Sequence, residues 1–340
     1  MILKKCIGKL IRKQNLSAEE CHQVINELIA EDANALQIAA FLVLLRAKPE
    51  TSAEIIGIVN AFREKMIHVP IAGKTIDIVG TGGDAAKTIN ISTGAAILAA
   101  SCGAKVTRLG NRAATSQCGA ADVLEQLGIS LEMSGDQIAE CVNKVGIGFF
   151  FYPKFNPVML NLRSLRRQLN IPTILNLIGP LLHPAHATHY IYGVYEEKLM
   201  EPLAEITYSL GIEKALIVHG NGLDEISCIG PTKAIEVTEK GMKSFVIDPK
   251  QFGFHECTLA DIQGGAPEIN AKLLLDALSG KTGAIADTLI LNAAVALWVY
   301  GMYTSIEQAI PIVKENLING SAFKLLQRWI AYSQDMQSSM

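Results

Sequence analysis

Residues 77–93 read Asp-Ile-Val-Gly-Thr-Gly-Gly-Asp-Ala-Ala-Lys-Thr-Ile-Asn-Ile-Ser-Thr. The apolar start predicts a strand, the glycines predict a loop, and the end of the segment predicts the first turn of a helix. Glycines in this position let phosphate oxygens approach backbone N–H groups beside a positive helix terminus. A tight turn alone is the simpler alternative, but it does not require five small polar residues within ten positions: Asp84, Thr88, Asn90, Ser92 and Thr93. We therefore interpret the segment as a phosphate-binding loop, although it matches neither the dinucleotide fingerprint nor a Walker loop.

The chain around this loop repeats an order of strand, loop and helix. From Lys74 onward, short β-branched or apolar runs are followed by glycine and then by alanine-rich segments. This order predicts an α/β domain whose twisted, mostly parallel sheet is flanked by helices. We expect strands at Thr75–Val79, Ala104–Arg108, Ile191–Val194, Lys214–His219, Lys233–Val237 and Gly241–Ile247, and helices at 92–101, 119–127, 198–210, 268–278 and 285–301.

The first seventy residues predict a small all-helical domain. Ser17–Glu20 and Thr51–Glu54 match capping boxes, and each precedes an apolar run with helical spacing. Residues 155–185 again show helices and proline-bounded turns, and we expect them to pack on this domain. The predicted division is therefore 1–70, with 155–185 packed on it, and an α/β domain formed by 71–154 and 186–340, which contains the predicted phosphate-binding loop.

Composition narrows the class of protein. A chain of 340 residues favours two folding units, and 49% hydrophobic with 19% charged residues is typical of a globular protein. The net charge of -3 and the scattered Lys and Arg residues argue against nucleic acid as a partner. Seven cysteines without a Cys-x-x-Cys pair favour a reducing cytoplasm. The apolar stretch Gly283–Met302 contains Asp287, Thr288 and Asn292, so we expect a buried helix and no membrane span.

Two further segments carry candidate chemistry. In Gly222-Leu-Asp-Glu225, adjacent carboxylates follow a predicted strand, where ligands bind in open α/β folds, and they suit Mg²⁺. A solvated acidic loop is the alternative for such a pair considered alone. Gly110–Arg112 and Thr115–Gly119 read as a glycine-bounded loop able to cover a phosphorylated substrate, or as a plain polar surface loop.

Three other kinds of residue are candidates for a site. Arg166 could hold a carboxylate through its planar guanidinium, although an exposed arginine pair with Arg167 is the usual explanation. The histidines of residues 183–189 are interrupted by Pro184, so we interpret them as a turn and not as a metal site. Cys118 has no histidine at a motif-like distance that would make it a nucleophile.

Seven blocks in order give the chain a resemblance to one family. They are residues 77–84, Asn90-Ile-Ser-Thr93, Gly110-Asn-Arg112, residues 121–125, residues 173–181, Gly222-Leu-Asp-Glu225 and residues 264–270. Over nearly its whole length the chain resembles the anthranilate phosphoribosyltransferases, which have a nucleoside-phosphorylase-like phosphoribosyltransferase fold. The resemblance implies Mg²⁺-dependent transfer of phosphoribosyl from phosphoribosyl pyrophosphate (PRPP) to anthranilate in tryptophan biosynthesis. It also implies a cleft between the two domains and a homodimer formed through the helical domain.

The same resemblance implies roles for individual residues, and no certain catalytic side chain. The PRPP site would comprise Gly80, Gly82, Gly83, Asp84, Thr88, Asn90, Ile91, Ser92, Thr93, Arg108, Gly110, Asn111, Arg112, Thr115, Ser116 and Ala120. The anthranilate site would comprise Gly80, Asn111, Arg166, Gly179 and Pro180, and the Mg²⁺ ligands would be Ser92, Asp224 and Glu225.

Three positions depart from the family pattern. Arg108-Leu109 stands where the family usually has Lys-His, and Ala120 stands where it usually has Ser or Thr. Leu109 replaces a polar ring expected near the acceptor with a side chain that cannot form hydrogen bonds. Two alternatives therefore stay open: a related phosphoribosyltransferase or phosphorylase with another aromatic amine or a base as acceptor, and a non-catalytic paralogue that binds nucleic acid.

Overall fold

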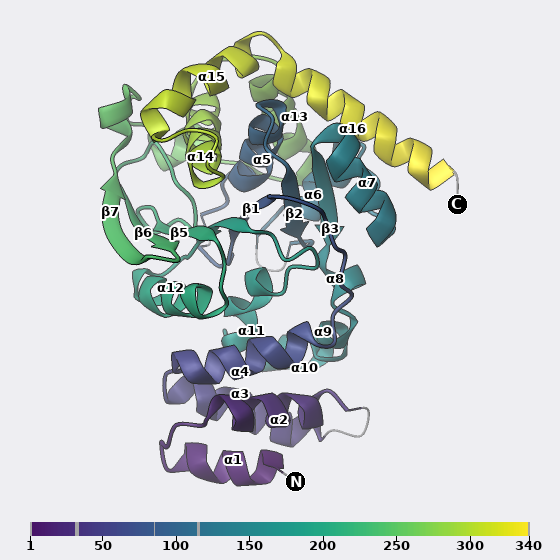
Figure 1. Ribbon diagram of the computed structural model, residues 1–340, viewed down its shortest axis with the longest axis vertical. Coiled ribbons are helices and arrows are strands. Elements are labelled where there is room, and N and C mark those ends of the chain that lie inside the picture. The colour runs from purple at the N-terminus through teal and green to yellow at the C-terminus, as the bar shows by residue number, and fades with distance from the viewer. Residues whose placement is uncertain (1, 31–33, 85, 114–115, 339–340) are drawn as a thin grey trace.

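A seven-stranded sheet forms the centre of the protein (Figure 1). The computed structural model describes residues 2–30, 34–84, 86–113 and 116–338. The strand order is β3-β2-β1-β4-β5-β6-β7; neighbours from β3 to β5 are parallel, whereas β6 and β7 are antiparallel to their neighbours. The strands are β1 (Ile76–Gly80), β2 (Val106–Gly110), β3 (Ile147–Phe151), β4 (His189–Gly193), β5 (Lys214–His219), β6 (Thr232–Thr238) and β7 (Gly241–Ile247).

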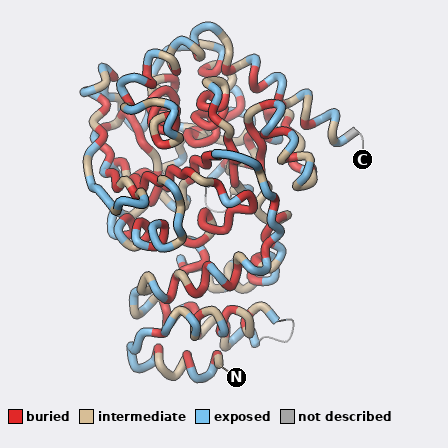
Figure 2. Tube along the Cα trace, in the orientation of Figure 1, coloured by how far each residue is buried: buried red, intermediate tan, exposed pale blue. Residues whose placement is uncertain are grey.

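Two hydrophobic clusters cover the two faces of the sheet, because alternate side chains of a strand point to opposite faces. Ile78 and Val79 are successive residues of β1, and they belong to different clusters. The first cluster contains one face of the sheet and helices α5 (Ile91–Ser101), α6 (Ala120–Gln126), α7 (Gly135–Val145), α13 (Pro267–Leu278), α14 (Ala284–Val299), α15 (Ile306–Ile318) and α16 (Ser321–Ser338). Buried segments run through the interior of this layer in Figure 2.

The second cluster joins the opposite face of the sheet to a helical bundle (Figure 1). It includes residues of α12 (Met200–Ser209), which lies between the sheet and the bundle. The bundle contains α1 (Ile2–Ile11), α2 (Ala18–Leu28), α3 (Ala35–Ala47) and α4 (Ser52–Arg63). The short helices α8 (Tyr152–Phe155), α9 (Pro157–Asn161), α10 (Arg163–Leu169), α11 (Ile174–Leu177) and the 3₁₀ turn η1 (Gly179–Leu181) link the bundle to the sheet.

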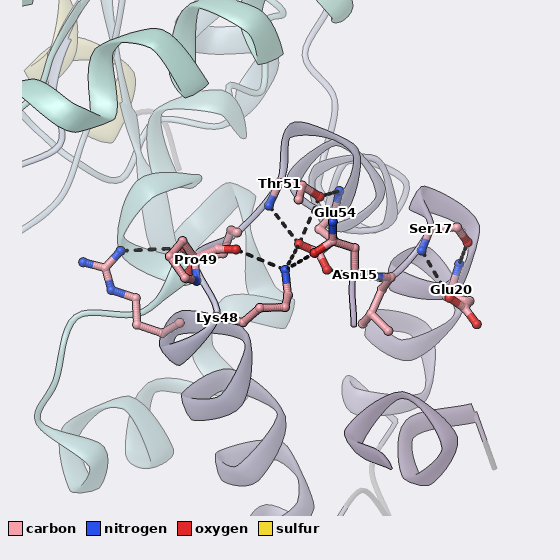
Figure 3. Close-up of polar contacts among 10 residues, drawn as sticks. Asn15, Ser17, Glu20, Lys48, Pro49, Thr51 and Glu54 are labelled. Atoms are coloured by element: carbon pink, nitrogen blue, oxygen red, sulfur yellow. Dashed lines mark hydrogen bonds and ion pairs between the residues drawn. The ribbon is translucent and has the colours of Figure 1, made fainter. Parts of the chain in front are cut away.

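Both predicted capping boxes are present in the bundle (Figure 3). Ser17 and Thr51 accept hydrogen bonds from backbone N–H groups three residues later, and Glu20 and Glu54 bond back. Glu54 is fully buried, yet its oxygens also bond the backbone N–H of Leu16 at 2.7 Å and the ammonium of Lys48 at 2.9 Å. A buried carboxylate is stable only with such partners, so Glu54 holds the bundle together and is not free for substrate.

The structure confirms the predicted fold class: a helical bundle and an α/β part with a mostly parallel sheet. The six predicted strands are present within two residues at each end, and β3 is an additional strand. The apolar stretch 283–302 forms the buried helix α14. Among the described residues, no helix combines the length and apolar character needed to cross a membrane.

Candidate active site

The candidate site lies where neighbouring parallel strands end. The glycine-rich loop (residues 80–90) joins β1 to α5, and the acidic loop (residues 220–225) follows β5. β4 pairs with both β1 and β5, so the two loops leave the same edge of the sheet. Thr81 N–H donates to the carbonyl of Gly193 at 2.9 Å, which fixes the start of the glycine-rich loop against the end of β4.

Two hydrogen bonds join the glycine-rich loop to the acidic loop. Gly82 N–H donates to Asp224 Oδ2 at 2.6 Å, and Ser92 N–H donates to Glu225 Oε1 at 3.1 Å. A Cβ atom at Gly80 would overlap the Asp224 carboxylate, so this close approach requires glycine. Gly82 has φ +69°, a backbone conformation that favours glycine as well. The structure therefore brings together the segments predicted to hold the phosphates and the metal.

Burial controls the electrostatics of the acidic pair. It is the main reason that the pKa of Asp224 lies above its usual range, and the charge of Asp84 raises this pKa further. The pKa of Glu225 is raised first by burial and then by the charge of Asp224. Closely spaced buried carboxylates of this kind ionise readily only when a cation balances them. The pair therefore fits a divalent cation with hard oxygen ligands.

The described residues contain no group of three or more His, Cys, Asp or Glu side chains placed to hold a metal ion. Mg²⁺ does not need one, since it commonly binds one or two carboxylates and takes its other ligands from water and substrate phosphate. The Ser92 hydroxyl is a further nearby oxygen, although in the structure it accepts a hydrogen bond from Arg108 Nη2 at 3.0 Å.

Arg108 is a buried cation that contacts Asp77 and Ser92. Its side chain is 5% exposed, and Nη1 lies 3.5 Å from Asp77 Oδ1. Its positive charge also opposes the rise in the pKa of Glu225. The imidazole Nε2 of His183 lies 2.7 Å from the carbonyl of Thr107 and 3.7 Å from Asp77 Oδ2. Arg108 is thus held between Asp77 and Ser92, a geometry that its sequence position did not predict.

The loop after β2 is organised by α6. Arg112 Nη1 lies 3.1 Å from Asp122 Oδ1 and 2.7 Å from Glu125 Oε2, so its charge is paired in this structure. Asn111 anchors the loop, because its carbonyl accepts from Ala121 N–H at 3.1 Å. Of the other residues predicted in this region, Gly110 ends β2, Ala120 begins α6, Ser116 Oγ lies 3.4 Å from the carbonyl of Cys118, and Thr115 lies outside the described residues.

One residue that positions the glycine-rich loop was not predicted as part of the site. The side-chain amide of Asn270 donates to Asn90 Oδ1 at 2.8 Å, and Asn90 donates to the carbonyl of Cys118 at 3.1 Å. Asn270 Oδ1 also accepts from Gly265 N–H at 2.7 Å. The segment 264–270 was visible as a sequence block, but only the fold shows that its last residue touches the loop. Of the other predicted residues, Gly83 is exposed and Thr88 is half-buried in the loop, whereas Ile91 and Thr93 are buried in the first turn of α5.

The predicted acceptor residues lie on the segments that link the sheet to the bundle. Arg166 is on α10 and is half-buried, and burial lowers its pKa. Its guanidinium forms no hydrogen bond or ion pair with any residue that the structure describes. Gly179 and Pro180 form the start of η1, and a Cβ atom at Gly179 would meet open space. An unpaired, partly desolvated guanidinium is suited to a carboxylate ligand.

Comparison with known proteins gives the same assignment over nearly the whole chain. Residues 72–323 match the glycosyl transferase family a/b domain, and residues 4–66 match the helical bundle domain of that family. An anthranilate phosphoribosyltransferase of Chlamydia felis is 38% identical over 337 residues, which cover 99% of this chain and 98% of the relative.

Two solved structures have the same architecture. Anthranilate phosphoribosyltransferase from Thermus thermophilus aligns with a TM-score of 0.91 at 35% identity, covering 97% of this chain and 99% of that chain. The Saccharomyces cerevisiae enzyme, in complex with PRPP and Mg, aligns with a TM-score of 0.90 at 28% identity and 98% coverage of both chains. The chain therefore belongs to the anthranilate phosphoribosyltransferase family of glycosyl transferases.

Proposed function

We propose that this protein transfers phosphoribosyl from PRPP to the amine of anthranilate and releases pyrophosphate, with Mg²⁺ as cofactor. The observation that carries the proposal is the contact between the glycine-rich loop and the buried pair Asp224 and Glu225. This contact places backbone N–H groups and two carboxylates at one edge of the sheet, as a metal-bound pyrophosphate requires. The yeast relative with PRPP and Mg supports the same donor.

In the reaction, the bond between C1 of the ribose and the pyrophosphate oxygen breaks, and a bond forms between C1 and the anthranilate nitrogen. The nitrogen then loses a proton to water. Bound Mg²⁺ would neutralise the charge that grows on the leaving pyrophosphate. We assign Asp224, Glu225 and Ser92 to hold the metal, and the glycine-rich loop to bind phosphate oxygens through its N–H groups.

The residues proposed to bind the acceptor would orient its amine toward C1 of the ribose. An aromatic amine is a nucleophile at neutral pH without a strong base, so much of the rate comes from holding it in line with C1. We propose that the unpaired guanidinium of Arg166 binds the anthranilate carboxylate, with Asn111, Gly179 and Pro180 nearby. This assignment requires no side chain to act as general base.

The test is loss of anthranilate fluorescence with PRPP and Mg²⁺, against a matched reaction that lacks PRPP. We expect loss only in the complete mixture, and no loss above the control would contradict the proposal. Because Leu109 is buried and apolar, a parallel screen of other aromatic amines and pyrimidine bases at fixed PRPP tests the alternative acceptor. If another compound in that screen is a better acceptor than anthranilate, that compound would take the place of anthranilate as the proposed substrate. Salt-sensitive DNA binding without PRPP binding would instead favour the non-catalytic alternative.

We further propose a homodimer through the helical bundle, in a reducing cytoplasm. Helix α3 has apolar residues on all sides. Leu36 is 82% exposed on it, and the exposed Val43 lies two turns further along the same face. Exposed apolar surface of this kind favours contact with a second copy. All seven cysteines are free thiols, which fits the reducing compartment. Light scattering of wild type and Leu36→Asp tests the dimer, which the variant is expected to weaken.

A further inference from the structure

We infer that Tyr152 is a further acceptor-binding residue, whose phenol hydroxyl donates a hydrogen bond to the carboxylate that Arg166 holds. The inference rests on the proposed function, since it assumes an aromatic acceptor with a carboxylate. It adds the first residue of α8, directly after β3, to an acceptor site otherwise formed by α10, η1 and the residue after β2.

The position of Tyr152 in the fold is the first support. In the sheet, Gly110 at the end of β2 is the register partner of Phe151 at the end of β3. Asn111 and Tyr152 therefore leave adjacent strands at the same edge. Tyr152 also packs against both hydrophobic clusters, so its ring lies at the junction between the sheet and the bundle. Arg166 of α10 and Gly179 and Pro180 of η1 also lie on the segments that link the sheet to the bundle.

The state of its hydroxyl is the second support. The Tyr152 oxygen is buried, and it has no hydrogen-bond partner in the structure. Leaving a buried hydroxyl unpaired is unfavourable, so such a group beside a candidate site is suited to donate its hydrogen bond to a bound ligand. Burial raises the pKa of Tyr152, and the positive charge of Arg166 opposes that rise. The positive charge of Arg166 is therefore felt at the Tyr152 phenol, and we place the acceptor carboxylate between the two side chains.

The third support comes from the neighbouring strand. Leu109 on β2 is 2% exposed and lies in the first hydrophobic cluster. It offers no hydrogen bond to an acceptor. Its register partner on β3 is Phe150, two residues before Tyr152. Tyr152, the residue directly after β3, thus carries a hydrogen-bond donor next to the end of β2, where Leu109 carries none.

The experiment compares Tyr152→Phe with wild type in steady-state kinetics at saturating PRPP and Mg²⁺. The substitution keeps the ring and removes only the hydroxyl. We expect KM for anthranilate to rise about tenfold, as for loss of one hydrogen bond to a charged group. We expect kcat and KM for PRPP to stay within about twofold, because the hydroxyl contacts neither C1 nor pyrophosphate.

Competitive inhibitors test whether the Tyr152 hydroxyl contacts the carboxylate of the acceptor, because benzoate has that group and aniline lacks it. Inhibition by benzoate is expected to weaken in Tyr152→Phe by the same factor as KM, whereas inhibition by aniline is expected to stay unchanged. Tyr192→Phe is the matched control, because the Tyr192 hydroxyl is also buried without a partner, but its ring stacks on Tyr190 in β4. This control is expected to have wild-type KM.

The possible outcomes distinguish failure of the role of Tyr152 from failure of the proposed function. If wild type consumes anthranilate and Tyr152→Phe has the same KM and benzoate inhibition, the role of Tyr152 is wrong and the proposed function stands. An equal rise in KM in both tyrosine variants would mean that removing any buried hydroxyl disturbs the site, and would also overturn the role. If wild type fails to consume anthranilate, the proposed function fails and this inference with it.

Discussion

The donor side and the acceptor side of the candidate site differ in how many of their polar groups are already paired. On the donor side, the glycine-rich loop bonds Asp224 and Glu225, and Arg108 is held between Asp77 and Ser92. On the acceptor side, neither the Arg166 guanidinium nor the Tyr152 hydroxyl bonds a described residue.

This difference has a structural origin. The donor groups come from β2, from the segment after β1 and from the loop after β5, so the register of one sheet fixes their positions before any ligand binds. The acceptor groups come from the start of α8, directly after β3, and from α10, two of the short helices that link the sheet to the bundle. A preorganised donor side tolerates little change, since each group is a partner of another. On the acceptor side the groups are not partners of one another. A substitution there can therefore alter contact with the ligand without disturbing a second residue.

The largest expected effect comes from Asp224→Asn combined with Glu225→Gln. The amides keep the shape, and each still offers an oxygen to the Gly82 and Ser92 N–H groups, but the charge that balances Mg²⁺ is gone. We expect turnover to fall by at least about 10³-fold. Without Mg²⁺ we expect the variant to melt no lower than wild type, because it no longer buries two carboxylates.

The control for this pair is Asp276→Asn on α13, whose carboxylate forms surface ion pairs with Lys272 and Lys281. It is expected to retain wild-type turnover, since exposed pairs contribute little. Wild-type-like, Mg²⁺-dependent activity in the double variant would show that the donor side is not where we place it, and the comparison of the two sides would lose its basis.

A smaller effect is expected on the acceptor side from Arg166→Ala. Loss of a charge-assisted contact to a carboxylate is expected to raise KM for anthranilate by about 100-fold, with KM for PRPP nearly unchanged. Arg166→Lys is expected to recover only part of the loss, because an ammonium lacks the planar fork. Steady-state kinetics with each substrate varied in turn provide the measurement.

Arg167→Ala is the matched control, because Arg167 is the next residue of α10 and is exposed. We expect it to change KM by less than about twofold, the scale of an exposed charge. Equal losses in the two variants would point to a general effect of positive charge on this helix, and would remove Arg166 from the acceptor site.

The place of the donor segments in the fold could be predicted from the sequence more directly than that of the acceptor segments, because the donor signals are local. Residues 77–93 and 222–225 each contain their own strand end and polar groups, so their place at one sheet edge follows from chain order. The domain division at about residue 70, with 155–185 on the bundle, stays a prediction, as do the individual site residues.

What the sequence could not give depends on tertiary contacts. β3 was missed because Ile147–Phe151 is a short apolar run, and such runs do not distinguish a buried strand from a helix. Tyr152 follows that strand, so its place beside Asn111 was invisible too. The contact of Asn270 with Asn90 joins residues 180 positions apart, and no local pattern encodes it.

The smallest expected effect is a pH dependence of stability confined to the donor side. The pKa values of Asp224 and Glu225 are raised in the folded protein, chiefly by burial, above the ordinary values of 3.8 and 4.5. Between those ordinary values and neutral pH, the metal-free folded state therefore binds more protons than the unfolded chain, and its stability falls as pH rises. Bound Mg²⁺ reverses this loss, because it stabilises the ionised pair.

Thermal melting from about pH 5 to about pH 8, with and without Mg²⁺, measures this effect. We expect the metal-free Tm to fall by a few degrees over this range, and the gain from Mg²⁺ to grow with pH. In Asp224→Asn with Glu225→Gln, we expect the metal-free Tm to fall less with pH, and we expect Mg²⁺ to raise Tm no longer. Arg166→Ala should show the same fall in Tm with pH and the same gain from Mg²⁺ as wild type. If the rise in Tm caused by Mg²⁺ does not change with pH, or persists in the double variant, the metal binds somewhere other than Asp224 and Glu225. The donor side would then not be the preorganised metal site that we describe.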